Sequence, residues 1–379
     1  MDFDFNDDQE SLRDAVRRWV DKGYDFERRR AIVREGGFSQ KAWGEIAELG
    51  LPGLVVPADA GGMGFGPIEA MVVMEELGRG LVLEPYAHTA LVAAPLLAGR
   101  SAPAASAWLG KACAGEAIVV LALQERRARY RLEHVSTRAE RDGSGQWVLT
   151  GTKGVVPAGA HAQAFIVPAR VSGTDDDPAG IALFLVERGQ GVETTAYALQ
   201  DGSSAADLRL QRASAQELVA AGEAFEALNL AVDRGIAALC AEAVGAMDRL
   251  FAITVDYLNT RKQFGVAIGT FQALRHRVAD MKMQLELARS MSYFAALRLN
   301  DAPQVRRLAL SQAKVQLGQS MRYVGQQAIQ LHGGIGVTEE YSAGHYFKRL
   351  TCIEMSFGDT MHHLGEVASR MQDTAGVFA

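Results

Sequence analysis

The C-terminal third of the chain contains three long segments with helical periodicity, at residues 226–259, 270–300 and 303–331. The turn KQFGVAIG separates the first two, and Asn300 to Pro303 separates the second from the third. Helices of this length usually pack side by side, because most helical stability comes from burying an apolar face against neighbours. With a short last helix at about 361–371, the sequence predicts a C-terminal four-helix bundle over residues 226–379.

The preceding residues have a different composition. Residues 116–225 contain short runs rich in Val, Ile, Leu and Phe, such as AIVVLAL and IALFLVER, separated by Gly, Asp and Ser clusters. This pattern predicts a mostly antiparallel β domain. Residues 1–115 are mostly helical, and Ser39 is an N-cap candidate for a helix that Gly50 ends. The expected fold class is α+β multidomain: an N-terminal helical domain (1–115), a middle β domain (116–225) and the bundle (226–379).

Composition excludes several classes of function. The chain has 379 residues and a formal net charge of -6, which gives no reason to expect binding to nucleic acid or to an anionic membrane. No segment offers the roughly 20 consecutive apolar residues of a membrane span, and the acidic start MDFDFNDDQESLRD is unlike a signal peptide. Three isolated cysteines fit neither a disulfide framework nor a metal site. We therefore expect a cytoplasmic protein without a metal.

Two motifs suggest a phosphate-bearing ligand. The first, within residues 257–281, places Arg261 in the turn RKQFG. An arginine in a tight turn can meet a diphosphate with paired donors. The second, within residues 327–341, contains QLHGGIG, whose consecutive glycines let the backbone approach a nucleotide closely. The alternative is that Arg261 only ends a helix and the glycines only turn the chain.

Both motifs, with the order of the three domains, closely resemble the acyl-CoA dehydrogenase family over the whole chain. The resemblance implies an FAD cofactor, an acyl-CoA substrate that is dehydrogenated between its α and β carbons, and an acceptor of the electron-transfer flavoprotein type. In this family the turn residues serve the flavin of the adjacent subunit, so they imply a dimer interface at the cofactor. Position by position, the implied FAD contacts are Arg261, Phe264, Gln272, Gln330, Gly333, Gly334 and Thr360.

The catalytic base of the family is not where the resemblance predicts it. The family's glutamate lies in a Tyr-Glu-Gly-Thr-like motif, and the aligned residues here are Phe357, Gly358, Asp359 and Thr360. Asp359 is the remaining catalytic candidate, but it lies one position later, which on a helix rotates a side chain by about 100°. Some members carry the base 26 positions before the turn arginine, and that position is Gly235 here. The neighbouring Asp233 and Arg234 look like a solvated helix start.

The middle domain also departs from the family. A loop resembling Thr-Glu-Pro-Gly-Ala-Gly-Ser-Asp should follow its first strand, and the chain has ALQERRARYRLEHVSTRAERDG instead. We interpret the basic stretch RRARYRLEHVSTR as a solvated strand face. Where the family has Lys-x-Trp-Ile-Thr, the chain has Lys153 followed by GVVP. The aromatic wall and the hydroxyl that face the flavin ring are therefore missing.

These losses suggest three hypotheses. The first is a degenerate subunit, resembling the small subunits of pimeloyl-CoA and steroid side-chain dehydrogenases, that joins a catalytic acyl-CoA dehydrogenase subunit in an α2β2 tetramer. The second is a self-sufficient homodimer or homotetramer in which Asp359, with His362 or His363, removes the proton. The third is a non-enzymatic acyl-CoA-binding or scaffold protein. The first explains best why only the residues that serve a neighbour's flavin are intact.

Overall fold

The computed structural model describes residues 5–374, with side chains to residue 371. These residues form two compact units. One unit contains residues 31–66 and 83–235, and the other contains residues 5–30, 67–82 and 236–374. No helix among the described residues is both long enough and apolar enough to cross a membrane. The predicted domain boundaries near residues 115 and 225 stay predictions.

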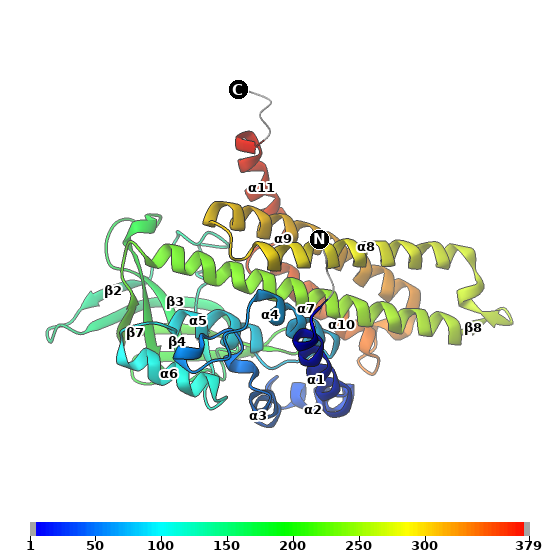
Figure 1. The fold of residues 1–379 in the computed structure, drawn as a ribbon, viewed down its shortest axis with the longest axis horizontal. Coiled ribbons are helices and arrows are strands. Elements are labelled where there is room, and N and C mark those ends of the chain that lie inside the picture. The colour runs from blue at the N-terminus through cyan, green and yellow to red at the C-terminus, as the bar shows by residue number, and fades with distance from the viewer. Residues whose placement is uncertain (1–4, 375–379) are drawn as a thin grey trace. The chain divides into compact units, whose positions relative to one another are not determined.

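The unit of residues 31–66 and 83–235 contains the sheet (Figure 1). The strands pair in the order β1-β4-β2-β3-β7-β5, and β4 also pairs with β5, so the sheet closes on itself. Pairing is antiparallel except for β1 and β2 against β4. The predicted β domain is confirmed. Its strands are β1 (Val119–Leu121), β2 (Arg138–Arg141), β3 (Trp147–Pro157), β4 (Ala164–Arg170), β5 (Ile181–Glu187), β6 (Val192–Ala198) and β7 (Ser204–Val219).

Helices from the first part of the chain complete this unit. Ser39 caps α3 as predicted, since its hydroxyl accepts a hydrogen bond of 3.2 Å from the Ala42 amide. The helical elements are α3 (Gln40–Glu48), the π-helical segment η3 (Ala87–Ala93), α5 (Ala94–Leu97) and α6 (Pro103–Cys113). Helix α2 (Phe26–Arg34) runs from one unit into the other.

The other unit is helical. Helices α1 and α4 come from the N-terminal part of the chain and belong to the same unit as the C-terminal helices. Gly78 and Gly245 let α4 and α7 approach closely, because a Cβ at either position would lie about 2 Å from a backbone oxygen of the other helix. The helices are α1 (Asp7–Gly23), α4 (Pro67–Arg79), α7 (Ala224–Thr260, which starts in the sheet-containing unit), α8 (Gln272–Arg298), α9 (Pro303–His332), α10 (Ser342–Met355) and α11 (Thr360–Thr374).

The four predicted C-terminal helices are present as α7, α8, α9 and α11, and α10 is an addition that the sequence did not reveal. One detail was wrong. Asp233 is fully buried within α7, so it is no solvated helix start. The chain therefore has an N-terminal helical domain, a middle β domain and a C-terminal helical domain, as the fold class predicted.

Candidate functional site

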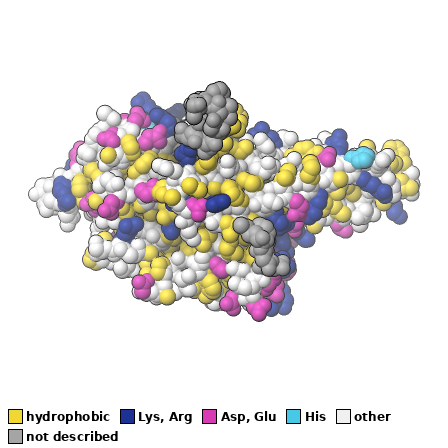
Figure 2. Space-filling view, turned by 45° about the horizontal axis from the view of Figure 1, so that its top comes forward, with side chains coloured by type: hydrophobic (Ala, Val, Ile, Leu, Met, Phe, Trp, Pro, Cys, Tyr) yellow, Lys and Arg dark blue, Asp and Glu magenta, His cyan; other side chains and the backbone are white. Residues whose placement is uncertain are grey.

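The turn after α7 presents Arg261 and Phe264 to solvent. Strands β8 (Lys262–Gln263) and β9 (Val266–Ala267) pair on either side of Phe264 and Gly265, which both have positive φ, as a two-residue hairpin turn requires. Phe264 is 92% exposed. The Arg261 side chain is exposed and makes no hydrogen bond or ion pair with any described residue. Figure 2 shows hydrophobic and basic side chains together at the tip where β8 and the start of α8 lie.

The glycine turn follows α9 directly. Gly333 has a φ of 63°, and a Cβ added at Gly333 or Gly334 would meet nothing within 4 Å. The backbone there is open to a ligand. Gln330, in the last turn of α9, and Gln272, at the start of α8, are both exposed. Their amides are available as donors or acceptors.

A ring contact brings the two turns together. The Tyr257 ring, one helical turn before Arg261, lies 4.7 Å from the ring of His332, which directly precedes Gly333. Tyr341 packs against the same imidazole with 5.1 Å between ring centroids. His332 is buried, and its Nδ1 lies 2.8 Å from the Ala328 carbonyl oxygen, to which it donates. The ring contact links the helix that ends before Arg261 to the helix that ends before Gly333. An exposed guanidinium and an open glycine backbone are both groups that can bind a diphosphate.

The segment with Asp359 forms a rigid turn between α10 and α11. The Asp359 carboxylate accepts a hydrogen bond of 2.8 Å from the His362 amide, which is the bond of a helix N-cap. Gly358 has a φ of 112°, and a Cβ there would lie 2.6 Å from imidazole atoms of both His362 and His363. A glutamate at position 358 would therefore require the turn to rearrange.

Neighbouring side chains fix this turn further. The Glu354 carboxylate accepts hydrogen bonds from the Thr360 amide (3.1 Å) and hydroxyl (2.7 Å). His363 is buried between the Ser311 hydroxyl, 3.2 Å from Nδ1, and the Phe357 carbonyl oxygen, 3.1 Å from Nε2. Burial lowers the pKa of His363 to about 2, so the imidazole stays neutral. Glu354, Asp359 and His363 thus each have structural hydrogen bonds within this turn and its surroundings.

Lys314 anchors the same segment from α9. Its buried ammonium donates to three backbone carbonyls at the end of α10, those of Ile353 (2.7 Å), Glu354 (3.1 Å) and Ser356 (2.7 Å). Burial lowers the pKa of Lys314 to about 8. All three donors are used, which makes the lysine a helix C-terminal clamp. Sequence reasoning missed it, because its partners are backbone atoms 39 to 42 positions away.

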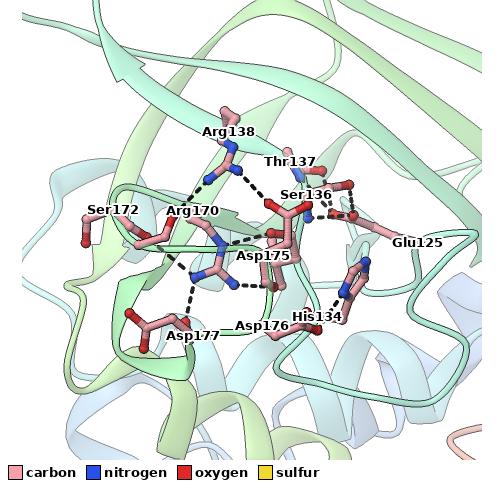
Figure 3. Close-up of polar contacts among 12 residues, drawn as sticks. Glu125, His134, Ser136, Thr137, Arg138, Arg170, Ser172, Asp175, Asp176 and Asp177 are labelled. Carbon is pink, nitrogen blue, oxygen red and sulfur yellow. Dashed lines mark hydrogen bonds and ion pairs between the residues drawn. The ribbon is translucent and has the colours of Figure 1, made fainter.

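The middle domain contains a buried ion pair where the family's flavin loop was expected, and Figure 3 shows the carboxylate of that pair, Glu125, beside Ser136 and Thr137. The Lys153 ammonium lies 2.7 Å from the Glu125 carboxylate, and both side chains are buried. The same carboxylate accepts hydrogen bonds from the amides and hydroxyls of Ser136 and Thr137. Although burial opposes it, Lys153 and these donors lower the pKa of Glu125 to about 2. Glu125 was missed because its partners are distant in the sequence.

A strained strand residue lies next to this pair. Val155 has a φ of 48°, which is costly for a β-branched residue, and a register shift interrupts the pairing of β3 with β7 there. Its amide donates to Asp207 (2.9 Å), which also accepts the Tyr197 hydroxyl (2.7 Å). The exposed Val155 side chain therefore occupies a fixed position where the family has an aromatic wall.

The basic stretch 126–138 is not a strand face, as the sequence had suggested. Residues 126–130 form a turn, and only Arg138 enters a strand. Arg131 pairs with Asp176 (3.1 Å) and Arg138 with Asp175 (2.5 Å). Arg170 is buried near Arg138 (Figure 3) and donates to five backbone carbonyls, those of Glu133, Val135, Ser172, Asp175 and Asp177. The stretch is thus tied to the acidic loop 175–177.

Comparison with known proteins decides the family. Models of the acyl-CoA dehydrogenase N-terminal, middle and C-terminal domains match residues 6–116, 120–212 and 209–372. The acyl-CoA dehydrogenase IpdE2 of Mycobacterium tuberculosis is 30% identical over 327 residues, which are 85% of this chain and 83% of the relative. The chain belongs to the acyl-CoA dehydrogenase family. This is a family of FAD-dependent oxidoreductases.

Other acyl-CoA dehydrogenases match over the full length. FadE27 of Mycobacterium tuberculosis is 28% identical over 99% of this chain and 100% of its own. A chain from the solved ChsE4-ChsE5 complex of the same organism is 26% identical, with a TM-score of 0.88 over 99% of this chain and 100% of that one. Among the described residues of the chain, no group of three His, Cys, Asp or Glu could hold a metal ion.

Proposed function

We propose that this chain is the catalytically degenerate subunit of a heteromeric acyl-CoA dehydrogenase. It completes the FAD site of a catalytic partner subunit, which supplies the base and most of the acyl pocket. The complex dehydrogenates an acyl-CoA thioester between its α and β carbons and passes the electrons to an acceptor of the electron-transfer flavoprotein type. FAD, when bound, accepts the hydride that leaves the β carbon.

The turn at Gly358 is the observation that carries this proposal. A catalytic base must reach the α-proton from a fixed position. The position that aligns with the family's glutamate is a glycine with positive φ, and both neighbouring histidines crowd the space that a side chain would need. The Asp359 carboxylate is engaged by the His362 amide at 2.8 Å, so no observation favours the homomeric alternative in which it removes the proton.

Unlike the crowded turn at Gly358, the residues that would contact a partner's flavin are exposed. Arg261, Phe264, Gln272, Gln330, Gly333 and Gly334 are all exposed. In this proposal Arg261, which has an exposed side chain, pairs with the diphosphate, and the open backbone at Gly333 and Gly334 approaches it. The 92% exposed Phe264 ring gives this turn an apolar group beside a cation, which suits contact with another molecule. This half of a cofactor site argues against a purely scaffolding role. Thr360 fits less well as a flavin contact, since its hydroxyl already bonds Glu354.

The middle domain also supports the proposal that this chain has no complete flavin site of its own. Its polar groups at the expected flavin loop bind one another, with Glu125 holding Lys153, Ser136 and Thr137. Such a self-satisfied network leaves few donors for a ligand. A relative of this fold has been solved as the ChsE4-ChsE5 complex, which fits a pairing of two related chains.

Substitution of Arg261 tests the proposal in a reconstituted complex. The chain is co-purified with a catalytic acyl-CoA dehydrogenase subunit that has the family's glutamate, and FAD is measured by absorbance. Arg261→Gln in this chain should weaken FAD retention by the complex by at least tenfold, about the effect of losing a charge-assisted hydrogen bond. Lys262→Gln, at the neighbouring exposed position, is the control and should have little effect. Equal retention by both variants would count against the assigned site.

A further inference from the structure

Helix α11 has an inverted distribution of polarity. Among its side chains described, those of residues 360–371, the large apolar Met361 (72%), Met371 (57%) and Leu364 (44%) are exposed. The charged Glu366 and Arg370 in the same range are half-buried and pair with each other at 3.3 Å. At the top of the view in Figure 2, where α11 lies, hydrophobic side chains are visible on the outer surface. A helix of a monomer normally shows the reverse arrangement.

The exposed apolar residues form one narrow stripe. Met361, Leu364, Ala368 and Met371 follow a spacing of three, four and three residues, which is that of a coiled-coil seam. At about 100° per residue they fall within an arc of about 80°, and Glu366 lies about 180° from its centre. The seam therefore contains no charge, and the ion pair Glu366–Arg370 lies away from it.

The stripe is also symmetric along the helix. Glu366 is the midpoint of the stripe along the sequence. Met361 and Met371 lie five positions before and after it, and Leu364 and Ala368 lie two positions before and after it. If two copies of α11 pair antiparallel across a two-fold axis, Met361 faces Met371 and the large Leu364 faces the small Ala368. Self-complementarity of this kind is the requirement of an isologous interface, and alternation of large and small residues allows close packing.

We infer that the stripe Met361–Leu364–Ala368–Met371 is a seam that binds α11 of a second copy of this chain. A helix of 15 residues is about 22 Å long. Four side chains on it bury roughly a few hundred Å² per partner, well under the about 800 Å² of a standard interface. The seam alone gives a weak dimer, and it joins two larger assemblies. In the proposed heteromer the seam would link two pairs of unlike chains, and this part of the inference rests on the proposed function. The pairing of α11 with α11 of a second copy does not rest on it.

Cysteine cross-linking of the full-length chain tests the seam without flavin or partner. Leu364→Cys and Ala368→Cys are introduced together and singly, and the protein is oxidised at high concentration. The double variant should form a covalent dimer at least tenfold faster than either single variant or wild type, because in the antiparallel pair position 364 of one copy faces position 368 of the other. Equal rates in all four proteins would overturn the inference.

A second variant tests the assembly. Met361→Glu with Leu364→Glu should halve the sedimenting mass of the heteromer while its FAD content stays unchanged, since the turn at Arg261 is untouched. Val305→Glu, an exposed apolar position on α9, is the matched control. Urea unfolding shows whether both variants are folded. An unchanged mass for a folded seam variant would contradict the inference, as would cross-links that join α11 only to the partner subunit.

Discussion

The Asp359 carboxylate caps helix α11 by accepting a hydrogen bond of 2.8 Å from the His362 amide. The residue that most resembles a catalytic base in this chain therefore has a local structural task. Its neighbour Gly358, at the aligned position of the family's glutamate, allows the turn that makes this cap possible.

Substitutions of Asp359 separate the two roles. Asp359→Asn keeps a capping oxygen and should change the free energy of unfolding by less than about 0.5 kcal/mol, while Asp359→Ala should lose about 1 kcal/mol. In the reconstituted heteromer both variants should retain kcat within about twofold when folded. Urea unfolding and a steady-state assay with an artificial acceptor measure the two effects. A loss of turnover of 10³-fold or more in Asp359→Asn would restore Asp359 as the base.

Gly358 should not tolerate a side chain. Gly358→Ala forces an L-residue into a φ of 112° and places a Cβ 2.6 Å from the imidazoles of His362 and His363, so we expect a loss of about 2–4 kcal/mol in unfolding free energy. Gly365→Ala is the matched control. Gly365 is an exposed residue of α11, and a Cβ added there would meet nothing within 4 Å, so the alanine should raise the free energy of unfolding by up to about 1 kcal/mol. A neutral effect of Gly358→Ala would show that the turn is less constrained than described.

The buried pair in the middle domain should be costly to break. Lys153→Met leaves the Glu125 carboxylate buried without its cation and should cost about 3–5 kcal/mol. Replacing both residues, as Glu125→Gln with Lys153→Met, should recover part of that loss. Lys41→Met, at an exposed position, is the control. Additive losses in the double-mutant cycle would mean that the two groups do not stabilise each other.

Stability should fall as the pH rises through the titration of Glu75. Burial raises the pKa of Glu75 to about 7, with Arg289 on α8 at 3.6 Å opposing it. The folded state binds the proton of Glu75 more tightly than the unfolded state does. The free energy of unfolding therefore falls by an amount on the order of 3 kcal/mol between about pH 4.5 and pH 7, and it is level above pH 7. Unfolding of Glu75→Gln should lack this decline, while the exposed Glu223→Gln should keep it. Parallel pH profiles for Glu75→Gln and wild type would contradict the assignment.

Local patterns predicted much of the fold. Helix periodicity located α7, α8, α9 and α11, and apolar runs between turn residues located the sheet. Helix α10 was missed because its sequence SAGHYFKRLTCIEM lacks an N-cap side chain and is interrupted by β-branched residues, so that tertiary packing and the Lys314 clamp determine it.

Some residues of the candidate site could be predicted from local sequence motifs, and others could not. Arg261 and the glycines could be predicted as site residues because a turn motif is local, and that assignment stays a prediction; the structure adds the ring contact between Tyr257 and His332. The pair of Glu125 and Lys153 could not be found, since 28 positions separate them and nothing local marks a buried ion pair. From the sequence, Asp359 could be identified only as a carboxylate near the position of the family's base. Its role as a helix N-cap could not be predicted, because the cap depends on the turn that Gly358 makes with a positive φ.

The central claim is that this chain completes a flavin site without having one of its own, and flavin stoichiometry tests it most directly. The chain is purified alone and in complex with a catalytic subunit, each saturated with FAD and then desalted. We expect no retained flavin and no dehydrogenation for the lone chain, and one flavin for each pair of unlike chains in an active complex. One flavin for each copy of the lone chain, together with acyl-CoA dehydrogenation, would contradict it.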